Sequence, residues 1–301
     1  MFQQILCPID FSEASRHAAQ YAIALACQHR SVLTVLHVPP ERFVSPALPP
    51  FEPDATRVAE SRRLATDAAV LFESATRAGI NVEVLVECGQ PARQILTRAA
   101  ALPADVIVMG THGAGGFEHL MLGSVAEKVL RKATCPVFTV PEQAMLASGA
   151  AFKKIVCAVD FSEWSLSALG QACCLAEESG GIVIAVHVIE WPWHEPPVPQ
   201  LEGIPPEQAA VLLEYRRYQE KMAKSRLEAV THDIGLGRCR IDTRVAHGKP
   251  YAELLCTVER ERADLVVIGV HARSALDVFF FGSTTHQVVR RAPCPVLTLR
   301  H

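Results

Sequence analysis

The chain has 301 residues, of which 50% are hydrophobic and 20% are charged. This composition excludes intrinsic disorder for most of the chain, and the length suits two domains of about 150 residues. The net charge is −3 and the basic residues form no cluster, so we expect no nucleic-acid partner. No apolar run approaches the ~18 residues of a membrane span, so we expect no membrane partner either.

The ten cysteines stand mostly alone in apolar runs, as buried free thiols do in a reducing compartment. The opening MFQQILCPID has neither a charged region nor an apolar stretch of signal length. We therefore expect a cytoplasmic protein.

In the first half of the chain, apolar strand patterns alternate with helix patterns. The predicted strands are 3–9, 31–38, 81–87, 105–110 and 136–140. The predicted helices run from Ser12 to about His29, over about 54–78, from Pro91, and from Ser124. This alternation predicts a parallel sheet with helices on both faces.

The second half of the chain repeats this alternation. Its predicted strands are 154–159, 181–188, 240–246, 264–270 and 295–299, and its predicted helices begin at Ser162, 206, Pro250 and Ser283. The pattern again predicts a doubly wound α/β domain.

Direct alignment shows an internal repeat. Residues 5–15 and 155–165 share seven identities in eleven, and residues 105–140 align without gaps to 264–299 with 13 identities in 36. Repeats of this length are whole domains. We predict two tandem α/β domains, 1–145 and 152–301.

Ligands of open parallel sheets bind beyond the carboxyl ends of the strands, where the strand order reverses. After the first strand comes Asp10, and after the fourth comes the glycine-rich segment 110–124. Glycines let backbone N–H groups approach an anion, and a helix that starts at Ser124 adds further N–H donors. These features indicate a phosphate-binding site. The alternative is that the segment is a glycine-rich turn that only reverses the chain direction. No Gly-Lys-Ser/Thr sequence follows, so the segment is not a P-loop.

The spacing Gly110-x2-Gly113-x9-Gly123-Ser124, with PIDFS at the first strand and CPVFTV at the last, resembles the ATP-binding branch of the universal stress protein family. The resemblance covers nearly the whole chain, twice. It implies a flavodoxin-like sheet of order 3-2-1-4-5 in each domain and ATP as the ligand. It also implies a pseudo-two-fold that relates the domains through their fifth strands, with further homodimerisation left open.

By this resemblance, the adenine and ribose would meet Pro8, Ile9, Asp10 and Val38. Gly110 and His112 would lie along the ribose and α-phosphate, and the phosphates would be held by Gly113, Gly123, Ser124 and Val125. A divalent ion such as Mg²⁺ on the phosphates would offset their charge. In the second domain the corresponding residues are Asp160, Val188, Gly269, Gly282 and Ser283.

The second domain departs from the pattern at one glycine. Ala272 stands where the first domain has Gly113, followed by Arg273. If this position needs a positive φ, alanine costs roughly 1–2 kcal/mol. We therefore predict a degenerate nucleotide site in the second domain.

The sequence shows no lysine clamp, arginine finger or assembled catalytic base of the kind that phosphoryl transfer needs, and no catalytic or metal-ligating residue is predicted. The favoured interpretation is a regulatory ATP-binding protein of the stress response. One alternative is a slow ATP hydrolase or phosphotransferase with His112 or Asp10 as the reacting group. The other is a binding module for a non-nucleotide ligand with vestigial nucleotide sites.

Overall fold

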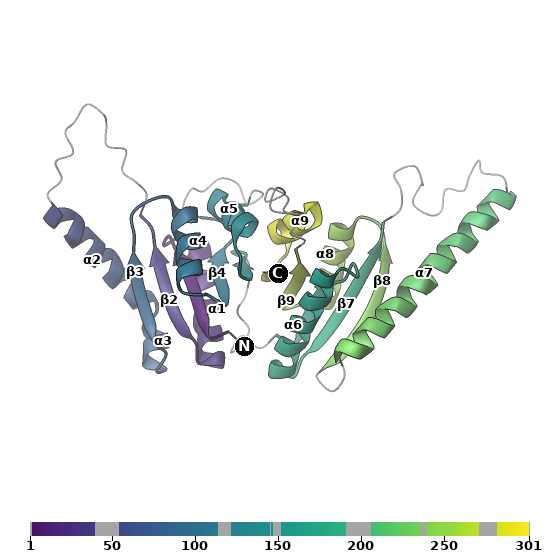
Figure 1. Cartoon of the computed structure of the whole chain (residues 1–301), viewed down its shortest axis with the longest axis horizontal. Coiled ribbons are helices and arrows are strands. Elements are labelled where there is room, and N and C mark those ends of the chain that lie inside the picture. Colours follow the sequence, from purple (N-terminus) through teal and green to yellow (C-terminus); the bar gives the residue numbers. More distant parts are fainter. Residues whose placement is uncertain are drawn as a thin grey trace, which may run out of the picture. The chain divides into compact units, whose positions relative to one another are not determined.

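The computed structural model describes residues 2–39, 54–113, 122–144, 146, 152–190, 206–235, 239–270 and 282–300. The chain divides into two compact units (Figure 1). The main span of the first is Met1–Ala150, and those of the second are Ala151–His271 and Gly282–Leu299.

The first unit is a parallel sheet of order β3-β2-β1-β4-β5. Because crossovers between parallel strands are right-handed, the helices that follow β1 and β2 cover one face and those that follow β3 and β4 cover the other. The elements are β1 (Gln4–Ile9), α1 (Glu13–His29), β2 (Val32–His37), α2 (Asp54–Leu71), α3 (Glu73–Arg77), β3 (Val82–Val86), α4 (Pro91–Ala101), β4 (Val106–Gly110), α5 (Ser124–Lys132) and β5 (Val137–Val140).

The second unit repeats this topology with the order β8-β7-β6-β9-β10. Its elements are β6 (Lys154–Ala158), α6 (Glu163–Ser179), β7 (Ile182–Ile189), α7 (Pro206–Gly235), β8 (Arg240–His247), α8 (Pro250–Glu261), β9 (Leu265–Gly269), α9 (Ser283–Arg291) and β10 (Val296–Leu299). The predicted α/β class and the strand order 3-2-1-4-5 are thus confirmed.

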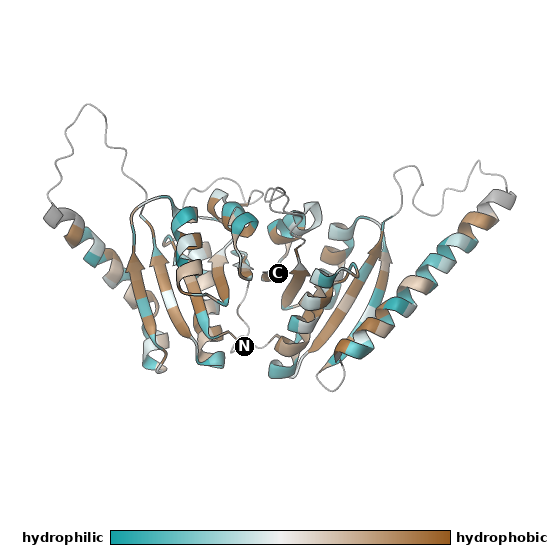
Figure 2. Ribbon diagram, viewed as in Figure 1, coloured by the Kyte–Doolittle hydropathy of each residue, from teal (hydrophilic) through white to brown (hydrophobic). Residues whose placement is uncertain are grey.

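The central strands are mostly apolar, as expected for strands that helices cover on both faces (Figure 2). In each unit the strand that leads to the site is almost fully enclosed; Leu6 of β1 and Val156 of β6 are 0% exposed. The edge strands β3 and β8 are only half-buried. The rigid centre of each sheet therefore carries the residues that follow β1, β4, β6 and β9.

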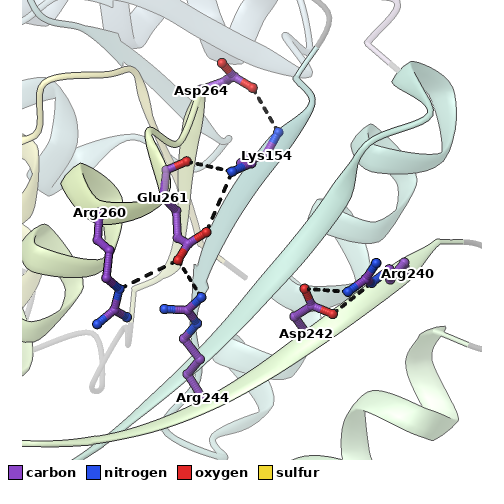
Figure 3. Close-up of polar contacts among 7 residues, drawn as sticks. All are labelled: Lys154, Arg240, Asp242, Arg244, Arg260, Glu261 and Asp264. Atoms are coloured by element: carbon purple, nitrogen blue, oxygen red, sulfur yellow. Dashed lines mark hydrogen bonds and ion pairs between the residues drawn. The ribbon is translucent and has the colours of Figure 1, made fainter.

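An aspartate ties the amino ends of two neighbouring strands together in each unit. Asp105 Oδ2 accepts from the backbone N–H groups of Gln3 and Gln4 at 2.7 and 2.8 Å. Asp264 Oδ2 accepts from those of Lys153 and Lys154, both at 2.9 Å; Figure 3 shows the contact with Lys154. This contact fixes the register of the strand pair whose opposite ends form the candidate site.

In the second unit the same edge carries an ion cluster around Glu261 (Figure 3). Its carboxylate lies 2.5 Å from Arg244, 3.6 Å from Arg260 and 3.7 Å from Lys154. Desolvation alone would raise the pKa of Glu261, but these three cations together lower it. The cluster joins the end of α8 to β6 and β8, at the sheet edge away from the site.

One predicted helix differs from the structure. The sequence predicts a single helix over about 54–78, whereas the structure divides it into α2 and α3 at Phe72. Phe72 has φ −106° and ψ 13° and is fully buried. The turn at this residue places the ring in the core, a tertiary effect that helical periodicity does not report.

Candidate functional site

The site begins at the turn between β1 and α1. Asp10 Oδ1 accepts from the backbone N–H of Ser12 at 3.0 Å and from its hydroxyl at 2.5 Å. The hydroxyl of Ser12 in turn caps α1 by accepting from the N–H of Ser15 at 3.2 Å. The carboxylate is therefore held in one orientation at the carboxyl end of the central strand, on the exposed side.

The second unit builds the same turn from equivalent residues. Asp160 accepts from the N–H and the hydroxyl of Ser162 at 2.9 and 2.5 Å, and Ser162 caps α6. Desolvation would raise the pKa of Asp160, but hydrogen bonds from Ser162 and Ser165 outweigh it, so the pKa lies below its ordinary value. The carboxylate is thereby kept ionised.

Both turns contain a phenylalanine in the left-handed region, which sequence reasoning missed. Phe11 and Phe161 each have φ 63°. This conformation costs a bulky residue free energy and is found where the surrounding structure enforces it. The one signal for it was that the sequence DFS occurs in both copies.

A histidine at the end of the second strand supports each phenylalanine. The Nδ1–H of His37 donates to the carbonyl of Ile9 at 2.8 Å, and its ring centroid lies 4.8 Å from that of Phe11. In the second unit His187 donates to Val159 at 2.8 Å and lies 4.4 Å from Phe161. These histidines hold the backbone of the first strand and the phenylalanine ring in place, which is a structural role at the edge of the site.

The glycine that ends β4 allows α1 to pack closely. A Cβ on Gly110 would lie 2.9 Å from the backbone of Ala14. The same holds for Gly269 at the end of β9, where a Cβ would lie 2.5 Å from the carbonyl oxygen of Trp164. These two glycines serve helix packing, and they set how near the helix start comes to the site.

Gly113 lies directly beside the Asp10 carboxylate. A Cβ on Gly113 would stand 2.7 Å from Asp10 Oδ2, closer than such contacts occur. The φ of Gly113 is not in the left-handed region. The positive φ considered as a condition for this position is therefore not found at Gly113. Glycine here lets the backbone approach Asp10 closely, and a Cβ would have to displace the carboxylate.

The start of α5 is anchored to the same place. The N–H of Gly123 donates to the carbonyl of Thr111 at 2.8 Å, and a Cβ on Gly123 would lie 3.7 Å from the backbone N of Gly113. Gly123 has no side chain to cap the helix, and the exposed Ser124 follows it. The first N–H groups of a helix have no acceptor within the helix, so those of Ser124 and Val125 can donate to a ligand here.

His112 lies between these groups. Its Nδ1 is 2.9 Å from the hydroxyl of Thr111, and its enclosed Nε2 finds no hydrogen-bond partner among the described residues. Val38, which follows β2, is 8% exposed, and Ile9 of β1 is 4% exposed. Pro8 also lies in the buried part of β1. The apolar residues expected near the adenine ring are therefore enclosed at the edge of the sheet.

In the second unit the described part of the site comprises Asp160, the half-buried Val188, Gly269, Gly282 and Ser283. Gly282 precedes α9 and has no capping side chain, as Gly123 does before α5. Residues 271–281 lie outside the described residues, and with them His271, Ala272 and Arg273.

The second unit also has an arginine beside its strand-one turn that the sequence did not predict there. The guanidinium carbon of Arg226 on α7 lies 4.3 Å from the ring centroid of Phe161. Helical periodicity alone gives no reason to place an arginine of this long helix over the strand-one turn. The two sites therefore differ in their surroundings as well as in the aligned glycine.

The fold and this corner define the class of protein: tandem doubly wound α/β units with a carboxylate, glycines and a helix N-terminus at the switch point of the strand order. The model of the universal stress protein family matches residues 1–141 and again 151–300. The chain belongs to this family, with two copies of its domain.

Individual relatives agree with this assignment. A universal stress protein of Thermus aquaticus is 37% identical over 149 residues, which is 50% of this chain and 99% of that protein. A universal stress protein of Mycobacterium tuberculosis is 25% identical over 300 residues, 97% of this chain and 95% of that protein. The crystal structure of a universal stress protein from Archaeoglobus fulgidus has a TM-score of 0.70 at 22% identity and covers 99% of this chain and 96% of its own, which shows the shared fold.

None of the helices in the described ranges is both long enough and apolar enough to cross a membrane.

Proposed function

We propose that the protein is a regulatory adenine-nucleotide-binding protein of the stress response, with ATP held at the carboxyl edge of the first unit. The observation that carries the proposal is the convergence of Asp10, Gly113 and the start of α5. The Cβ-free face of Gly113 and the uncapped N-terminus of α5 leave backbone donors available at one place. Donors of this kind suit phosphate, because they supply N–H groups and the positive end of the helix dipole.

The residues fit the parts of a nucleotide in different ways. Asp10, fixed by Ser12, would accept from a ribose hydroxyl, and the adenine would lie against the apolar sheet edge in which Ile9 and Val38 are buried. Gly113, Ser124 and Val125 would donate to phosphate oxygens. These residues bring a carboxylate and backbone donors but no lysine, so Mg²⁺ on the phosphate oxygens would offset their charge.

The arrangement supports binding rather than turnover. His112 has its Nδ1 beside the hydroxyl of Thr111, and its ring has no carboxylate partner among the described residues. A general base is usually oriented by such a partner. Regulation by nucleotide occupancy is therefore the function we propose.

Two measurements test this proposal. Nucleotide released from the denatured, purified chain is identified by chromatography and mass spectrometry, and ATP, ADP and AMP are titrated into the stripped protein by calorimetry. We expect adenine nucleotide in the first measurement and saturable ATP binding in the second. Steady turnover above about 1 s⁻¹ would favour an enzyme instead.

The Gly113→Val variant tests the site itself. Its Cβ would meet the Asp10 carboxylate at 2.7 Å, and its two methyl groups would fill the space beside the start of α5. We expect ATP binding to fall below detection by calorimetry. Gly170→Ala is the matched control, because a Cβ at Gly170 on α6 meets nothing within 4 Å. Wild-type affinity in Gly113→Val would contradict the proposed site.

A further inference from the structure

Helix α7 carries a row of large apolar side chains that the rest of the described chain does not cover. Val211, Tyr215, Tyr218 and Met222 are 67%, 53%, 58% and 50% exposed. Single exposed apolar residues are ordinary, but four on one helix form a patch of the kind that marks a binding surface. We call these four residues the α7 row.

The opposite face of the same helix is packed in its own unit. Arg216, Leu227 and Thr231 are buried, and α7 contacts β7, β8 and α6 (Figure 1). The α7 row therefore lies on the side of the helix opposite to the face that packs on the sheet. It is not needed to attach α7 to its unit.

The spacing of the α7 row is that of a helix–helix interface. The intervals from Val211 to Met222 are four, three and four residues, so the side chains lie in one stripe along the helix. The hydroxyl of Tyr215 accepts from Nε2 of Gln219 at 2.8 Å, which fixes one ring of the stripe. Such a stripe fits a second helix laid alongside it.

The charges beside the α7 row select the partner helix. Glu214 and Lys221 flank the row on one side, seven residues apart. When two copies of α7 are laid antiparallel with Tyr215 opposite Tyr218, Val211 falls opposite Met222. In this register Glu214 of each copy lies on the same side as Lys221 of the other, displaced by two residues or about 3 Å along the axis, within reach of the two long side chains.

We propose that the α7 row binds the α7 row of a second copy of this chain, antiparallel and about a two-fold axis. A two-fold interface needs a surface that is complementary to itself. The row meets this condition twice, in the pairing of its apolar residues and in the pairing of its charges. This interface is independent of the nucleotide proposal, because none of its residues belongs to the site.

The experiment is sedimentation velocity of the full chain over a range of concentrations, with circular dichroism to verify folding. We expect Tyr218→Glu to weaken self-association by roughly 10-fold or more, because it buries a carboxylate at the centre of the interface. Val70→Glu is the matched control, since Val70 on α2 is 67% exposed, comparable to Tyr218 at 58%, but lies outside the α7 row. It should associate like the wild type.

Charge exchange then identifies the partner and its direction. Glu214→Lys and Lys221→Glu should each weaken association about 5-fold, because each creates two like-charge pairs. An equimolar mixture of the two variants, and the double variant Glu214→Lys with Lys221→Glu, should recover wild-type association.

Three results would overturn the proposal. The first is a wild-type chain that stays monomeric up to about 100 μM, well above the dissociation constant of a micromolar interface. The second is self-association that Tyr218→Glu leaves unchanged, which would place the contact on another surface. The third is a mixture of the two charge variants that associates as weakly as either variant alone.

Discussion

At the scale of single residues, Asp160 makes stability depend on pH. Its pKa is lowered in the folded state by hydrogen bonds from Ser162 and Ser165, which outweigh desolvation. A group with a depressed folded pKa contributes stability above its unfolded pKa, roughly 3.9, and this contribution is lost as the pH falls through the folded pKa.

Ser162→Ala should therefore raise the pKa of Asp160 and lower the free energy of unfolding. The loss of the helix cap costs about 1 kcal/mol at any pH. The further loss of unfolding free energy that acts through the Asp160 carboxylate should be present near neutral pH. It should become smaller at acidic pH, because the carboxylate then protonates in the wild type as well. Carboxyl NMR titration and denaturant unfolding at several pH values measure both effects. An unchanged Asp160 titration in the variant would contradict this account.

Some of these residue roles could be read from the sequence, and others could not. The aspartate after the first strand and the Gly-Ser before the fourth helix are repeated in both copies, so their places at the sheet edge were predictable. The left-handed φ of Phe11 and Phe161 was not, because phenylalanine has no preference for that region. The reason for Gly113 was also not predictable, since the close approach of Asp10 appears only when two strand ends meet in space.

At the scale of elements, equivalent helices of the two units end in the same left-handed conformation but with different residues. Helix α1 ends at Arg30 with φ 53°, and α6 ends at Gly180 with φ 58°. Only glycine adopts this conformation without steric cost. At this helix end the first unit therefore carries strain that the second avoids, while at the end of α8 the second unit has its own left-handed arginine, Arg262 with φ 51°.

Arg30→Gly should raise the free energy of unfolding of the first unit by about 1 kcal/mol, and Gly180→Ala should lower that of the second by a similar amount. Gly170→Ala in the middle of α6 is the control of opposite sign. Its backbone is helical and its Cβ space is open, so alanine should stabilise by roughly 0.5–1 kcal/mol. Urea unfolding followed separately for each unit measures all three. Equal effects of Gly170→Ala and Gly180→Ala would contradict the assignment of strain to the helix end.

Element types were predictable where local signals agree with the fold. Apolar runs indicated the buried strands, and Ser12, Ser162, Pro91 and Pro250 marked helix starts that the structure confirms. The break at Phe72 was not predictable, because it depends on the core space that the ring fills. The exposed α7 row was likewise hidden, since its residues have the spacing of ordinary core positions of an amphipathic helix.

At the scale of the whole molecule, duplication gives two copies of one site that have diverged. Both units hold the strand-one aspartate in the same turn, and α5 and α9 each follow a glycine without a capping side chain and begin with a serine. They differ in Arg226, which stacks on Phe161 in the second unit, and in the residue aligned with Gly113. The family model matches both halves of the chain. Because the two sites nevertheless differ in these residues, membership of the family does not by itself predict equal nucleotide binding in the two units.

We expect ATP to bind the two units unequally, with the first unit stronger. A Cβ at Gly113 would stand 2.7 Å from Asp10 Oδ2 and would have to displace that carboxylate, and the sequence places Ala272 at the aligned position of the second unit. Losing one hydrogen bond to phosphate, at ~1–2 kcal/mol, corresponds to about 5- to 30-fold weaker binding. Calorimetry of the wild type should therefore resolve one strong site and one weak or silent site.

Exchanging the two residues tests whether this one position separates the sites. Ala272→Gly should strengthen the weaker site, and Gly113→Ala should weaken the stronger one, each by a factor within the same range. The double exchange should reverse the order of the two sites, because the Asp–Ser turns that flank them are alike. Two equal sites in the wild type would contradict unequal occupancy. Unequal sites that neither substitution changes would instead assign the difference to the surroundings. Arg226→Ala is then the next variant, because its guanidinium lies over the Phe161 ring beside the second site.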